Sequence, residues 1–120
     1  MRLQFNLTMP PAALALSSQA AADLGKRFRR LKLEVLGEVM EGAREILLRE
    51  SARREAGAPE GGLLLHIPVE RLSGREIASA ARLFRRVAEH LAGAGHRSPL
   101  FDRLAASFER GPALRKAWNN

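Results

Sequence analysis

The chain of 120 residues contains 46% hydrophobic side chains, which suits one compact domain and excludes an intrinsically disordered polymer. Because it has no cysteine and no run of roughly 20 apolar residues, the sequence excludes disulfides, thiolate metal sites and a membrane-spanning helix, and we expect a cytoplasmic protein. Its 20 Lys and Arg residues outnumber 13 Asp and Glu residues, for a net charge of +7, and this Arg-rich excess indicates a polyanionic partner such as DNA.

Residues 2–9 alternate between polar and apolar side chains. A period of two places the apolar set on one face of a strand and the polar set on the other, so a half-buried strand is predicted here. The apolar set is Leu3, Phe5 and Leu7, and the polar set is Arg2, Gln4, Asn6 and Thr8. Pro10 and Pro11 end the strand and can open a helix, because proline is tolerated in a first helical turn.

An Ala-rich helix is predicted from Ala12 to Leu24, and Gly25 is a candidate for its end. A run of positive charge follows, consisting of Lys26, Arg27, Arg29, Arg30 and Lys32. From 31 to about 55 the apolar residues keep helical spacing and form a broad face that can be buried against more than one neighbour. The same spacing also continues through Gly25, where a glycine inside a helix costs about 1 kcal/mol. One long helix from about 18 to 55 is therefore the alternative.

The second half of the chain opens with a linker and a second strand. Residues 57–62 hold three Gly and one Pro and are predicted to be the linker. The short apolar run LLLHIPV at 63–69 predicts the strand, and Pro68 places it at a sheet edge or at the end of the strand. The two halves are loosely similar, because a strand precedes a helix in both and because Phe28 and Phe84 are each followed by two arginines. No convincing repeat is found at the level of individual residues.

Two helices are predicted after this second strand. Ser73 and Glu76 have the spacing of a capping box, and the helix that they open is expected to end near Gly93. The other helix is predicted over 98–111, because a Ser-Pro pair begins it and a glycine stops it. The fold class is therefore mainly α with short β.

The segment Gln4-Phe5-Asn6-Leu7-Thr8-Met9-Pro10 carries the pattern Q-F-N-L-x-x-P, and Val-Met-Glu occurs at 39–41. These segments resemble the ribbon-helix-helix family of DNA-binding proteins, of the Arc repressor type, over roughly residues 2–47. In such proteins one strand from each of two chains forms a ribbon that enters the major groove. The resemblance implies a sequence-specific transcriptional regulator of the repressor type that acts as a homodimer or higher homo-oligomer. Residues 1–56 would form the DNA-binding and dimerisation region, 57–62 a linker, and 63–120 a helical C-terminal region.

The resemblance also implies roles for individual side chains. The base-reading residues would be Gln4, Asn6 and Thr8, with Arg2 in support. The dimer core would contain Leu3, Phe5, Leu7, Val35, Val39 and Met40. We predict phosphate contacts for Lys26, Arg27, Arg29 and Arg30. The sequence departs from the family at Thr8, where the repressor has a basic residue, and in a longer connection between Gly25 and Glu34.

The same sequence features allow an alternative arrangement. Strand 63–69 can pair with the N-terminal strand within one chain, which, with one long helix, gives an α+β fold with an intrachain two-stranded sheet. The function would then be a non-enzymatic protein-interaction or assembly module without specific DNA binding. We expect no catalysis, metal, cofactor or small-molecule substrate in either case, because His66, His90 and His96 lack acidic or thiol companions at metal-ligand spacing.

Overall fold

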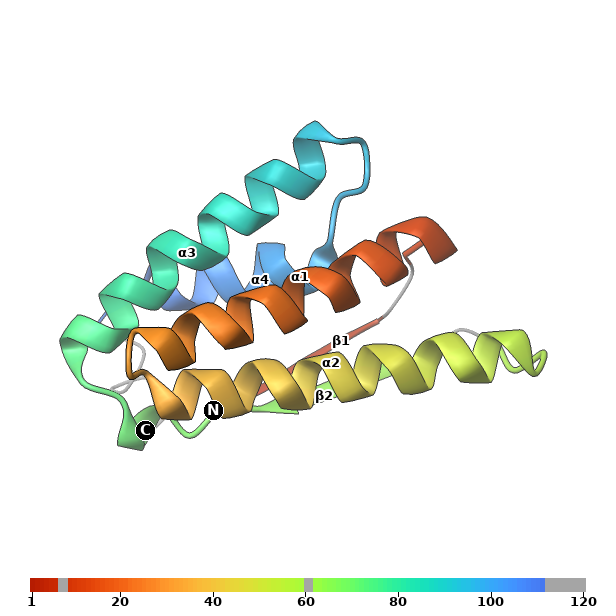
Figure 1. Ribbon diagram of the computed structural model, residues 1–120. Coiled ribbons are helices and arrows are strands. Elements are labelled where there is room, and N and C mark those ends of the chain that lie inside the picture. Colours follow the sequence, from red (N-terminus) through yellow and green to blue (C-terminus); the bar gives the residue numbers. More distant parts are fainter. Residues whose placement is uncertain (7–8, 60–61, 112–120) are drawn as a thin grey trace.

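The computed structural model describes residues 1–6, 9–59 and 62–111, without the side chains of 4–6 and 62–63. The described chain is mainly helical with a short two-stranded antiparallel sheet, as predicted (Figure 1). In chain order the elements are β1 (Arg2–Asn6), α1 (Pro11–Arg30), α2 (Glu34–Glu55), β2 (Gly62–His66), a 3-10 turn (Val69–Arg71), α3 (Gly74–Gly93) and α4 (Pro99–Phe108). None of the described helices is long and apolar enough to cross a membrane.

The two strands of the sheet belong to the same chain. β1 pairs antiparallel with β2 in a register that joins Arg2 to His66 and Leu3 to Leu65. Leu3 and Leu65 are buried, whereas Arg2, Leu64 and His66 are exposed, so one face of the sheet packs on the protein and the other faces solvent. This intrachain pairing is the alternative arrangement predicted from the sequence. The partner strand that the resemblance would take from a second chain is supplied here by β2.

The two long helices of the first half are separated by a tight turn at 31–33. Both predictions for Gly25 were therefore wrong, because the helix neither ends there nor runs on to 55. Lys32 adopts a left-handed conformation with φ of 61°, and the backbone N–H of Leu33 donates to the carbonyl of Phe28 at 2.8 Å. The same carbonyl also accepts from the backbone N–H of Leu31 at 3.1 Å, so two donors from the turn close the end of α1.

Gly25 lies inside α1, where its missing side chain lets α1 and α2 approach closely. A Cβ atom at this position would lie 3.3 Å from the Cβ of Met40. We expect Gly25→Leu to lower the free energy of unfolding by about 1–3 kcal/mol in urea denaturation, because the added atoms overpack this contact. The matched control is Gly42→Ala in α2, where nothing lies within 4 Å, and it should raise the stability by about 0.5–1 kcal/mol. A loss of stability in both variants would contradict this role for Gly25.

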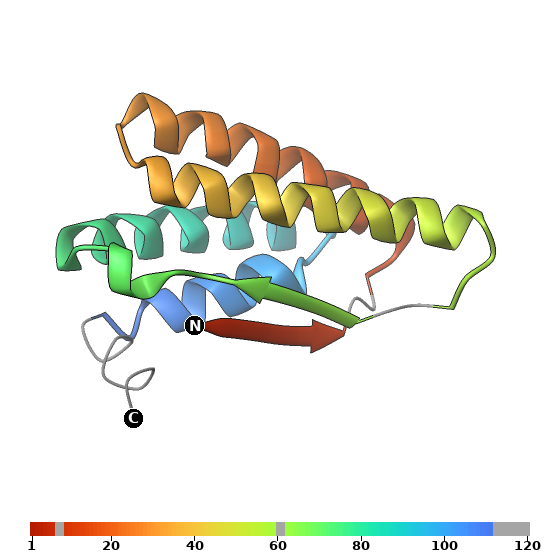
Figure 2. The same cartoon turned by 90° about the horizontal axis from the view of Figure 1, so that it is seen from below.

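Each half of the described chain has the same order of a strand and two helices, β1-α1-α2 and β2-α3-α4. The halves contact one another reciprocally, because α2 packs on β2, α4 packs on β1, and α1 meets α3. Figure 2 shows the sheet along one side of the molecule and α1 along the opposite side. The loose similarity in the sequence therefore corresponds to a repeat of structural elements.

A cluster of four phenylalanine rings joins the two halves. The rings of Phe28, Phe84, Phe101 and Phe108 are fully buried. The centroid of the Phe84 ring lies 5.8 Å from that of Phe28, 6.4 Å from that of Phe101 and 5.0 Å from that of Phe108. Because these rings come from α1, α3 and α4, they place both halves around one hydrophobic core.

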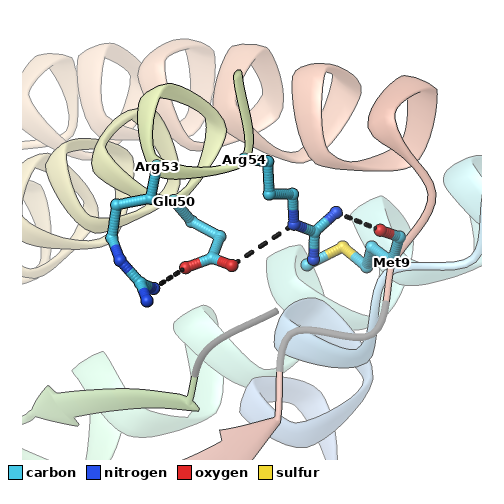
Figure 3. A network of polar contacts seen from close by, with 4 residues as sticks. All are labelled: Met9, Glu50, Arg53 and Arg54. Atoms are coloured by element: carbon cyan, nitrogen blue, oxygen red, sulfur yellow. Dashed lines mark hydrogen bonds and ion pairs between the residues drawn. The ribbon is translucent and has the colours of Figure 1, made fainter. Parts of the chain in front are cut away.

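A buried carboxylate connects α2 to the segment between β1 and α1. Glu50 is 3% exposed, and its two oxygens accept hydrogen bonds from Arg53 Nη1 at 2.8 Å and Arg54 Nε at 3.2 Å (Figure 3). Arg54 Nη1 also donates to the backbone carbonyl of Met9 at 2.5 Å. The network therefore ties the second half of α2 to the start of the first helical hairpin.

Candidate anion-binding groove

The basic run predicted for phosphate contact lies in the last turns of α1, and the helix divides it between two faces. Lys26, Arg27, Arg29 and Arg30 are all exposed. Because residues three positions apart are neighbours on a helix surface, Arg27 and Arg30 line a groove against α3, whereas Lys26 and Arg29 line another against α2. The structure therefore does not bring the four residues together into one site.

The groove between α1 and α3, called here the arginine groove, has a volume of about 470 Å³. Its polar lining residues are Asp23, Arg27, Arg30, Arg86 and His90, and its apolar floor consists of Ala20, Leu24, Val87 and Leu91. The two helices run in opposite directions (Figure 1), so Asp23 and His90 lie toward one end and Arg27 and Arg30 toward the other.

Three arginines give the arginine groove a positive charge. Within the described part of the chain, Arg27, Arg30 and Arg86 form no ion pair or hydrogen bond with another side chain. Asp23 is the acidic residue of the lining, and its carboxylate accepts a hydrogen bond from Gln19 at 3.0 Å. Three guanidinium groups against one carboxylate produce a local potential that attracts anions.

The two helices of this groove share a Phe-Arg-Arg triplet, at 28–30 in α1 and at 84–86 in α3. The two phenylalanine rings of the triplets meet edge to face, with an interplanar angle of 81°. This contact brings the last arginine of each triplet, Arg30 and Arg86, to the same groove. Sequence reasoning missed Arg86, although the repeated triplet was the signal that could have identified it.

The middle arginine of each triplet is held outside the arginine groove by a glutamate. Arg29 donates to Glu41 at 2.5 Å, and Arg85 donates two hydrogen bonds to Glu109 at 2.7 and 2.9 Å. The hydrogen bond from Arg29 lowers the pKa of the Glu41 carboxyl, and the hydrogen bonds from Arg85 do the same for the pKa of Glu109. Arg29 is therefore already engaged by a carboxylate, which makes it a poorer phosphate ligand than Arg27 and Arg30.

β1, which contains three of the four residues predicted to read bases, lies away from the basic run (Figure 2). Arg2 is exposed on the outer face of the sheet. Gln4 and Asn6 belong to β1, but their side chains lie outside the described residues, as does all of Thr8. The backbone of Gln4 is in register with Leu64, whose side chain is 55% exposed. Because the sheet and α1 lie on opposite sides of the molecule (Figure 2), the ribbon and the basic run do not form one surface.

The residues predicted for a dimer core are, where described, part of the core of one chain. Leu3, Val39 and Met40 are buried, and Val35 is partly buried against the same cluster. The side chain of Phe5 and all of Leu7 lie outside the described residues. The burial of the described members therefore requires no second chain.

The described ranges contain no group of three or more His, Asp or Glu side chains that could hold a metal ion. Comparisons with protein-family models, with curated proteins and with solved structures found no match to this chain. Membership of the ribbon-helix-helix family therefore stays a prediction.

Proposed function

We propose that this protein is a non-enzymatic DNA-binding protein that contacts phosphates with Arg27, Arg30 and Arg86. The observation that carries the proposal is the convergence of these three arginines on one groove, without acidic partners among the described residues. A guanidinium group suits a phosphate because its planar fork donates two parallel hydrogen bonds to two oxygens. The net charge of +7 adds a long-range attraction that speeds the encounter with DNA.

Binding of this kind has a characteristic dependence on salt. Each phosphate that a protein neutralises releases counterions from DNA, so the logarithm of the binding constant falls with the logarithm of salt by about 0.9 per contact. Removing three contacts in the triple variant Arg27→Ala/Arg30→Ala/Arg86→Ala should therefore make this slope shallower by about 2–3. The affinity at physiological salt should fall by at least about tenfold, as measured by fluorescence anisotropy with labelled DNA.

A control variant removes the same charge from elsewhere on the surface. Arg49 and Arg97 are both at least 75% exposed in their side chains, and Arg75 is exposed at the start of α3. The triple variant Arg49→Ala/Arg75→Ala/Arg97→Ala should keep a salt slope close to that of the unaltered protein. Equal losses in the two triple variants would show that overall charge, and not the arginine groove, carries the binding.

Sequence-specific readout of bases is a separate part of the proposal. The two-stranded sheet of β1 and β2 and the arginine groove lie on different sides of the molecule (Figure 2). A two-stranded ribbon suits the major groove, and the exposure of Arg2 and His66 on the outer face of the sheet supports this use. For a repressor of this type, selection from a random DNA pool at physiological salt should yield a consensus, palindromic if the protein acts as a homodimer. Gln4→Ala/Asn6→Ala should then relax the base preference, and a consensus unchanged by this variant contradicts readout by the ribbon.

The protein-interaction or assembly module is the second candidate function. The pairing of β1 with β2 within one chain favours this second function, because an interaction module of this kind was predicted to have an intrachain two-stranded sheet. Its other structural expectation, one long helix to 55, was wrong. This candidate predicts that the same selection yields no consensus and that binding to DNA is weak at physiological salt.

A further inference from the structure

We infer that the arginine groove takes in one unpaired nucleotide of a single strand, with its phosphate on the arginines and its base on the apolar floor. This inference rests on the proposed function, because it specifies the form of nucleic acid that the same site binds. It also gives the apolar residues of the groove a role in contacting the base, since phosphate contact involves only the arginines.

The composition of the groove supports two kinds of contact side by side. Its volume of about 470 Å³ lies in the range of small-ligand sites, and the groove is open to solvent on one side. The floor contains Leu24 and Leu91, which are each 4% exposed, beside the partly buried Val87 and Ala20. A flat base placed there would cover the apolar surface of Ala20 and Val87 that otherwise faces water.

The charges of the groove give a bound nucleotide one orientation. The carboxylate of Asp23 repels a phosphate, so the phosphate belongs toward the end where Arg27 and Arg30 lie. The base then extends toward Asp23 and His90, and a carboxylate there can accept a hydrogen bond from an amino group on the base edge. A guanidinium plane can also stack on a base, which adds a contact that only an unstacked base can make.

Duplex DNA presents its phosphates to such a site but not the faces of its bases. Only base edges are accessible in the grooves of a duplex, and turning a base out of the stack costs a few kcal/mol. An unpaired strand has no such cost, because its bases can be splayed apart. The groove should therefore prefer single-stranded to double-stranded DNA of equal length.

The test compares three labelled DNA ligands of about eight nucleotides at one salt concentration. One is a single strand with bases, one is the same backbone without bases, and one is the corresponding duplex. The strand with bases should bind about tenfold more tightly than the abasic strand, since a base contact of this kind contributes about 1–3 kcal/mol. It should also bind more tightly than the duplex. Equal binding of the first two ligands, or tighter binding of the duplex, overturns the inference.

A variant that fills the floor separates the base contact from the phosphate contact. Ala20→Leu adds apolar atoms to the groove and leaves the three arginines in place. It should abolish the difference between the strand with bases and the abasic strand while keeping the salt slope. The matched control is Ala15→Leu, at an exposed position of α1 outside the groove lining, which should keep the difference. Circular dichroism checks that both variants are folded.

The outcomes also distinguish the two proposals. If none of the three ligands binds, the proposed function fails together with the inference. If all three bind alike with a steep salt dependence, DNA binding stands and the nucleotide site does not. If unlabelled dAMP displaces the strand with bases at equal concentration, the groove is a site for free nucleotides and the assignment to a strand is overturned.

Discussion

Phe84→Ala should lower the free energy of unfolding by about 3–5 kcal/mol. Phe84 is fully buried and lies at the centre of the aromatic cluster, because its ring contacts Phe28, Phe101 and Phe108. Truncation removes the burial of the ring, leaves a cavity and ends three ring contacts, which include two edge-to-face contacts. Urea denaturation followed by circular dichroism measures the loss.

Two other variants show whether the loss comes from the ring itself. Phe84→Leu keeps most of the apolar volume and should cost about 1.5 kcal/mol. Arg86→Ala, two positions further along α3 on the exposed side, should change the stability by no more than about 0.5 kcal/mol. If Phe84→Ala costs no more than Arg86→Ala, the ring cluster does not hold the two halves together.

Glu50→Leu should destabilise the protein by about 2–4 kcal/mol, although leucine is the more apolar side chain. The carboxylate of Glu50 is buried and bonded to Arg53 and Arg54 (Figure 3), and only 15% of the Arg54 side chain is exposed. Without the carboxylate, a largely buried guanidinium loses its ion pair with Glu50 and retains its hydrogen bond to the carbonyl of Met9. Thermal and urea unfolding both report the change.

The neutral variant Glu50→Gln separates charge from hydrogen bonding. Gln retains one oxygen acceptor of similar shape, so its cost should be smaller than that of Glu50→Leu. Arg53→Ala should cost about 0.5 kcal/mol, since half of that side chain is exposed to solvent. A Glu50→Leu variant as stable as the unaltered protein would contradict a stabilising role for the Glu50 carboxylate.

The elements that sequence predicted well are those set by a few neighbouring residues. The capping box at the start of α3 forms as predicted, because Ser73 and Glu76 exchange two hydrogen bonds of 3.1 Å. Ser98 caps α4 in the same way, by accepting from the backbone N–H of Phe101. These signals depend on contacts within one helical turn, so local sequence contains the information.

The end of α1 was predicted wrongly because distant contacts decide it. Glycine is the common residue after a helix end, yet Gly25 is used for close packing against Met40. The helix ends instead where Lys32 takes the left-handed conformation, and lysine gives no sequence signal for it. Local propensity alone therefore could not place this turn.

The sequence showed the positive charge of the candidate site but not its geometry. The charge of the run at 26–30 was visible in the sequence, but its division between two faces depends on how α1 packs on α2 and α3. The contribution of Arg86 depends on the contact between Phe28 and Phe84, which are far apart in the chain. No local pattern reports such a contact, so the arginine groove appears only in the folded structure.

The pairing of β1 with β2 has a consequence for the order in which a newly made chain folds. Leu3 is synthesised roughly 60 residues before its partner Leu65, which corresponds to roughly 3–12 seconds at ordinary translation rates. During this interval the helices α1 and α2 can pack together, because all of their residues are already present. On the ribosome, β1 therefore waits longer for its partner strand than α1 waits for α2, which follows it directly in the chain.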